Sequence, residues 1–281
     1  MAIPVFTIII LFKYLPMYGI RFAFYEYGLF GIKEFIGLEN FRRLLVNERF
    51  WNAFNNTLIL SAYNIISGML CSIIIALLLN EITNKKFKNF VQTTLYLPHF
   101  LSWVVVASIF TLILSPESGF VNAIIELFGG KSIYFLTSQD WWRVCFVFIN
   151  RWKETGWGTI LYLAALSSID PQLYDSASAD GAGRLRQTWH ITLPSIFTTI
   201  LTVFILSLSS VLDLFMPVFV LYNPLVYPVS DVIETYNYRV GLIQADYDYS
   251  TAVGLFKSII TIVLVLGTNK LSKKLTGHGV L

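Results

Sequence analysis

The long uncharged stretches of the chain set the first limit on its fold. Thr57 to Asn80 holds 24 residues without a formal charge, and Thr93 to Ser115 is a second uncharged block. An α-helix needs about 20 apolar residues to cross the hydrocarbon core of a bilayer, so each block is long enough to span it. Only 13% of the residues are charged, against about 25% in soluble domains. The pattern predicts an all-α integral membrane protein.

The hydropathy pattern divides the chain into six predicted spans within a single transmembrane domain, residues 1–281. The first span is weakened by Lys13 and Pro16, and the fourth is interrupted by Arg151, Lys153 and Glu154. The predicted spans are residues 2–24, 57–80, 93–115, 144–168, 196–222 and 250–269. Residues 169–195 form the longest polar loop on one side of the membrane.

Basic residues in the loops predict the orientation. With six spans, both termini lie on the side of the loop 169–195, and that side carries eight Lys and Arg in about 50 positions. The opposite side carries seven in about 85 positions. Because cytoplasmic loops are enriched in Lys and Arg, both termini are expected in the cytoplasm. Leu38 to Phe54 mixes apolar and charged residues and predicts an amphipathic helix on the outer surface.

The loop 169–195 has the pattern of two short helices joined by glycines. Asp170 can cap a helix whose first residue is Pro171 and which runs to about Ala179. Gly181 and Gly183 are predicted to end it in backbone conformations that other residues avoid. A second helical segment follows before the fifth span. A short helix with a face of small residues beside a glycine hinge suits docking against another protein.

The spacing in this loop resembles the EAA loop of permease subunits in binding-protein-dependent ABC importers. That signature reads Glu-Ala-Ala, three residues, Gly, nine residues, Ile-x-Leu-Pro. Asp175 stands here in place of Glu and Ser176 in place of Ala, whereas the other positions match. The resemblance implies that ATPase coupling falls to Asp175, Ser176, Ala177, Gly181, Ile191, Leu193 and Pro194.

The resemblance extends over most of the chain. The runs Phe12 to Gly19, Leu97 to Trp103 and Leu221 to Tyr227 are similar to permeases of the carbohydrate-uptake group, most of all those for complex oligosaccharides. The family implies a six-helix type I importer permease that works by alternating access in the lipid bilayer. Its implied partners are a second related permease, a dimeric ABC ATPase, an extracytoplasmic solute-binding protein, and a sugar or oligosaccharide substrate.

No catalytic, cofactor or metal site is expected on this chain. Gly130-Lys131-Ser132 imitates the end of a phosphate-binding loop, but Ile125 stands where that loop requires glycine. ATP and Mg²⁺ are therefore expected on the partner ATPase, and this chain is not expected to be an enzyme. His99, His190 and His278 lack the spacing of metal ligands, and the scattered basic residues give no stripe for nucleic acid.

Polar residues inside the predicted spans are the candidates for the substrate path. A charge at the bilayer centre costs about 2.5–3.5 kcal/mol, so such residues usually face a bundle interior or an aqueous cavity. Arg151 and Glu154 are three residues apart on a helix and could form a structural ion pair instead. Tryptophan faces suit sugar rings, although they also pack between helices. The candidates are Asn150, Trp152, Lys153, Glu154, Trp157 and Asp213.

Two alternatives to sugar import stay open on the sequence. The first keeps the architecture and changes the cargo to glycerol-phosphate, a polyamine or a peptide. The second is a secondary transporter or channel, which has no need of a docking loop for an ATPase. Co-purification with an ATPase subunit distinguishes the second alternative from the importer.

Overall fold

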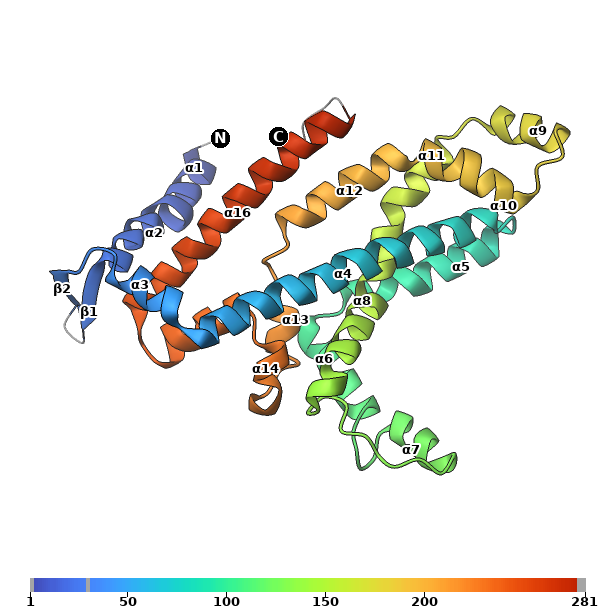
Figure 1. Ribbon diagram of the computed structural model, residues 1–281. Helices are drawn as coiled ribbons and strands as arrows, with labels where there is room; N and C mark the ends of the chain where they lie inside the picture. Colours follow the sequence, from blue (N-terminus) through green and yellow to red (C-terminus); the bar gives the residue numbers. More distant parts are fainter. Residues whose placement is uncertain (1–2, 29–30, 277–281) are drawn as a thin grey trace.

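The computed structural model describes residues 3–28 and 31–276 and is almost entirely helical (Figure 1). The longest helices are α4 (Glu48–Glu81), α8 (Gln139–Ser167) and α16 (Tyr247–Thr276). The other α-helices are α1 (Ile3–Ile9), α2 (Leu15–Met17), α3 (Glu39–Val46), α5 (Lys85–Tyr96), α6 (Trp103–Ile113), α7 (Phe120–Leu127), α9 (Pro171–Ala179), α10 (Arg184–Gln187), α11 (Leu193–Ser195), α12 (Phe197–Ser209), α13 (Phe215–Phe219), α14 (Tyr227–Ser230) and α15 (Ile233–Tyr238).

Short 3-10 and π segments connect several of these helices. The 3-10 segments are η2 (Tyr18–Phe24), η3 (Leu97–Phe100) and η5 (Pro224–Val226), and the π segments are η1 (Ile10–Tyr14), η4 (Thr188–Thr192) and η6 (Arg239–Ile243). The described residues also contain one antiparallel hairpin, β1 (Tyr25–Gly28) and β2 (Gly31–Phe35), with Tyr27 opposite Ile32.

By length and composition, three helical segments of the described chain can cross a membrane, and five can if each of two bent pairs is one span. The three are Pro4–Phe24, Glu48–Glu81 and Tyr247–Lys274. Helix α8 is not among them, and it carries Arg151, Lys153 and Glu154. The count of six spans therefore stays a prediction.

The predicted third span, 93–115, is not one straight helix. The segment Lys85–Phe100 meets α6 at a bend of 103°. Pro98 lies in the 3-10 turn η3, and the extended residue Ser102 caps α6 by accepting the Val105 amide at 3.3 Å. A proline and a new N-cap within five residues restart the helix in another direction.

The predicted fifth span, 196–222, is also interrupted. Helix α12 ends at Ser209, and α13 begins only at Phe215. In the break, the Leu214 amide donates to the Glu234 side chain at 2.9 Å. A backbone amide outside the helices therefore has a side-chain acceptor. Discontinuous helices of this kind are tolerated at membrane depth where protein or a cavity surrounds them.

The predicted amphipathic helix 38–54 is two helices, α3 and the start of α4. Asn47 separates them in an extended conformation, and its side chain accepts the amides of Arg49 and Phe50 at 3.0 and 3.3 Å. Helix α4 therefore begins nine residues before the predicted second span. Asparagine favours this N-cap because its short side chain reaches the unpaired amides of the first turn.

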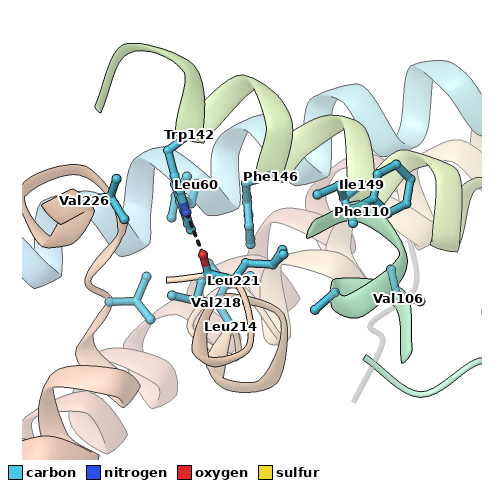
Figure 2. Packing of buried hydrophobic residues seen from close by; sticks show 12 residues of the cluster. Leu60, Val106, Phe110, Trp142, Phe146, Ile149, Leu214, Val218, Leu221 and Val226 are labelled. Carbon is cyan, nitrogen blue, oxygen red and sulfur yellow. Dashed lines mark hydrogen bonds between the residues drawn. The ribbon is translucent and has the colours of Figure 1, made fainter. Parts of the chain in front are cut away.

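Helices α4 and α8 pack against each other along the centre of the molecule (Figure 1). Small and hydroxyl residues let the two backbones approach: the Ser72 hydroxyl donates to the Thr155 carbonyl at 3.2 Å. Figure 2 shows the largest apolar cluster of the described residues, in which Leu60 of α4 lies beside Trp142 of α8. Trp142 is fully buried, and its indole N–H donates to the Leu221 carbonyl at 3.1 Å. A buried indole needs such a partner, so this bond fixes the segment after α13 against α8.

Gly156 brings α8 directly onto the end of α5. A β-carbon at this position would lie 2.0 Å from the backbone carbonyl oxygen of Leu95. Because a backbone oxygen cannot swing aside, we expect Gly156→Ala to destabilise the protein by about 1–3 kcal/mol. The matched control is Gly267→Ala in α16, where nothing lies within 4 Å of the added carbon. Thermal unfolding of the purified importer measures both, and equal midpoints for the two variants would contradict the expectation.

Figure 1 places α1, the C-terminal part of α16 and the α9–α10 segment along one edge of the molecule. The hairpin, α7 and α14 lie toward the opposite edge. The segment α9–α11 connects α8 to α12, and this connection matters for the site described next.

Candidate functional site: a central cavity and a coupling loop

A cavity of about 650 Å³ opens between α4, α8 and α12. This is within the usual range for small-molecule sites, about 300–1,000 Å³. Four of the six predicted path residues line it: Asn150, Glu154, Trp157 and Asp213. Helices α8 and α12 and the break after α12 supply most of its polar wall, and Trp103 borders it from α6.

Glu154 is held at the cavity wall by His99 and Lys153. Its carboxylate lies 2.7 Å from the His99 ring and 3.5 Å from the Lys153 ammonium. The ion pair between Arg151 and Glu154 that the sequence allowed is not formed. Glu154 instead binds His99, which the turn η3 brings close to its carboxylate. His99 also stacks on Trp157 with ring centroids 4.5 Å apart and an interplanar angle of 5°. The turn η3 and one turn of α8 thus form a single unit.

Lys153 and Trp152, predicted on the substrate path, do not line the cavity. Lys153 is 4% exposed, and its ammonium donates to the carbonyl oxygens of His99 at 2.6 Å and Pro98 at 3.5 Å. Trp152 packs edge-on against Phe110 at 5.3 Å. Successive residues of a helix point about 100° apart, so the three consecutive residues 152–154 cannot all face one cavity.

Asp213 lies in the break between α12 and α13. Its carboxylate accepts from Lys257 at 2.9 Å, and Lys257 also binds Glu234 at 2.6 Å. Glu234 in turn accepts the Leu214 amide. This cluster ties the break to α15 and α16, which explains how charges are tolerated in an apolar segment.

Several cavity residues on α4 were not predicted. Ser61, Asn64, Gly68 and Ser72 all line the cavity. Their spacing of three, four and four residues places them on one face of a helix. A search of the uncharged blocks for polar and small residues at helical spacing would have found them.

The loop 169–195 has the predicted start and end for its first helix. Asp170 caps α9 by accepting the Gln172 amide at 3.0 Å, and Pro171 is its first residue. Gly181 has a φ of +77°, and the amides of Gly181 and Ala182 donate to the carbonyls of Ser178 and Ala177. This is the Schellman ending, which favours glycine at the position with positive φ.

The prediction that Gly183 has a backbone conformation avoided by other residues is wrong. Its φ is −68°, in the extended region, where it is the N-cap of α10. The turn of the loop is therefore made at Gly181 alone, and Gly183 only begins the next helix.

Polar contacts hold the coupling segment, residues 170–195, in place, and large apolar side chains are exposed on its surface. Gln187 donates to Ser178 at 2.9 Å, which ties α10 to α9, and Arg184 pairs with Glu81 at the end of α4. Leu185 and Trp189 are 76% and 63% exposed. A braced surface with large exposed apolar side chains is typical of a protein-docking site.

The chain belongs to the family described as the binding-protein-dependent transport system inner membrane component, whose model matches residues 68–276. It is therefore the permease of a transport system, and the predicted family is confirmed. Its fold is that of a solved bacterial ABC transporter involved in import of the acidic polysaccharide alginate. The TM-score is 0.91, with 40% identity over 97% of this chain and 93% of the solved one. The predicted all-α importer-permease fold is confirmed.

Three relatives from Bacillus subtilis (strain 168) match this chain over nearly its whole length. The polygalacturonan/rhamnogalacturonan transport system permease protein YteP is 44% identical, covering 100% of this chain and 88% of its own. Protein LplB is 42% identical, covering 99% and 89%. The arabinooligosaccharides transport system permease protein AraP is 28% identical over 98% and 88%.

Proposed function

We propose that this chain is a membrane-spanning subunit of an ATP-driven importer that moves an oligosaccharide across the bacterial cytoplasmic membrane by alternating access. Two relatives that match nearly its whole length, and the solved transporter with this fold, are named for oligosaccharide or polysaccharide transport. The cavity volume, the polar residues around it and the exposed Trp157 suit a sugar. ATP is hydrolysed by a separate subunit.

The observation that carries this proposal is the connection between loop and cavity. The coupling segment directly joins α8 to α12, and both helices line the cavity. A partner that moves the segment therefore moves two walls of the cavity together. We assign ATPase docking to Asp175, Ser176, Ala177, Gly181, Ile191, Leu193 and Pro194, which lie in or beside α9–α11.

The proposed assembly contains a second related permease, an ATPase dimer and an extracytoplasmic solute-binding protein. A solved relative is described in complex with a periplasmic protein bound to an alginate pentasaccharide. The ATPase binds ATP and Mg²⁺, and it docks from the cytoplasm. The coupling segment, α1 and the end of α16 share one edge in Figure 1, which supports cytoplasmic termini.

Co-purification and uptake together test the proposal. We expect the tagged chain to purify with a second permease and an ATPase, and the complex in liposomes to accumulate oligosaccharide only with ATP and the solute-binding protein. Accumulation driven by an ion gradient without any ATPase would instead identify a secondary transporter. A cavity shared with a partner permease also predicts that neither permease alone supports uptake.

A further inference from the structure

The charged residues that line the cavity differ in whether they have an ion-pair partner. Three line it: Arg151, Glu154 and Asp213. Both carboxylates have cationic partners, since Glu154 pairs with His99 and Lys153, and Asp213 pairs with Lys257. Arg151 has no carboxylate within ion-pair distance among the residues that the structure describes. Of the three lining charges, Arg151 is therefore the one without a direct ion-pair partner among the described residues.

The guanidinium of Arg151 is also short of hydrogen-bond acceptors. Among the described residues, its Nη2 donates to the Asn64 side-chain oxygen at 3.2 Å, and its buried Nε has no acceptor. Nη1 lies against Gly68, where a β-carbon would be 2.1 Å away. Glycine thus leaves the space in which the guanidinium rests against α4. A guanidinium has five N–H donors arranged to hold a carboxylate through two parallel bonds.

We propose that Arg151 binds a carboxylate of the cargo, and that the cargo is an acidic oligosaccharide built from uronic acid residues. The inference rests on the importer function proposed above and names its substrate class. Neutral sugars offer hydroxyl groups only, and these would leave the Arg151 charge uncompensated in a half-apolar cavity. A uronate supplies the missing acceptor and charge in one group. Trp157, which lines the same cavity, gives the sugar ring an apolar surface.

The carboxylate could instead come from a neighbouring permease subunit, and the two sources predict different results. A cargo carboxylate makes Arg151 important for acidic cargo only. A subunit carboxylate makes it important for assembly, whatever the cargo. Removing a hydrogen bond to a charged group costs about 1.5–3 kcal/mol, or about 10- to 150-fold in affinity.

The test is uptake by the assembled importer in liposomes of trisaccharides of galacturonate, glucuronate and mannuronate, each compared with its methyl ester. The ester keeps the sugar skeleton and removes the charge. We expect the importer to take up at least one acid and to discriminate against its ester. Arg151→Gln should lower uptake of that acid at least tenfold, and Arg151→Lys should restore part of it. Arg42→Gln is the charge-matched control, because Arg42 is exposed on α3 away from the cavity.

Intact assembly of Arg151→Gln is checked by co-purification of all subunits and by its rate of ATP hydrolysis without receptor. Uptake of none of the acids, equal uptake of acid and ester, or wild-type uptake by Arg151→Gln would each overturn the assignment. Loss of assembly in Arg151→Gln would indicate that Arg151 contacts a partner subunit, and it would also overturn the assignment to the cargo. Failure of the importer proposal looks different, since no ATPase would then co-purify with the wild-type chain.

Discussion

Gly181→Leu is expected to lower ATP-driven uptake about tenfold while leaving the protein inserted and assembled. A non-glycine residue in the left-handed region costs about 1–2 kcal/mol, and Gly181 has a φ of +77°. Nothing lies within 4 Å of an added β-carbon, so the cost comes from the backbone and not from a clash. The strain is relieved only by changing the turn between α9 and α10. That change moves the docking surface relative to the cavity helices, and 1–2 kcal/mol shifts a population about 5- to 30-fold.

The measurement is receptor-stimulated ATP hydrolysis together with uptake in liposomes. Gly181→Ser and Gly183→Ser form a matched pair in the same turn, because Gly183 has an ordinary φ of −68° and serine is a good N-cap. We expect the first to reduce coupling and the second to leave it near wild type. Wild-type coupling in Gly181→Leu, or equal losses in the serine pair, would show that the hinge geometry is unimportant.

Lys153→Met is expected to destabilise the protein by about 1–3 kcal/mol, because it deletes a buried ammonium that binds two carbonyl oxygens and a carboxylate. The substitution keeps the length of the side chain and deletes its ammonium. The carbonyl oxygens of Pro98 and His99 lose the Lys153 ammonium, and Glu154 keeps its contact with His99 but loses that with Lys153. The turn η3 should loosen from α8, and the stack of His99 on Trp157 at the cavity wall should loosen with it.

Thermal unfolding of the purified complex measures the loss, and uptake at low temperature measures the effect on transport. Lys131→Met is the control, because Lys131 is exposed in the loop between α7 and α8. An unchanged midpoint for Lys153→Met would mean that η3 is held by packing alone. Reduced uptake with an unchanged midpoint would favour a direct role of Lys153 on the substrate path.

The membrane class, the helical fold and the two-helix loop 169–195 could be predicted from local patterns in the chain. These depend on local information: uncharged blocks longer than a bilayer, an N-cap at Asp170, and a glycine where α9 ends. Of the predicted path residues on α8, Asn150, Glu154 and Trp157 are spaced by four and three, which places them on one helix face, and all three line the cavity. Such features are set by neighbours in the chain and need no knowledge of the packing.

Only the tertiary structure decided which charges are paired and which face the cavity. His99 reaches Glu154 across 55 residues, and Lys257 reaches Asp213 across 44. Neither pairing has a local signature, because each depends on the bend at η3 or on the break after α12. The same pairings left Arg151 without a carboxylate in ion-pair distance among the described residues, although the sequence had offered Glu154 as its partner. In a membrane interior a charge takes whichever partner the packed helices bring near, since leaving it alone is costly.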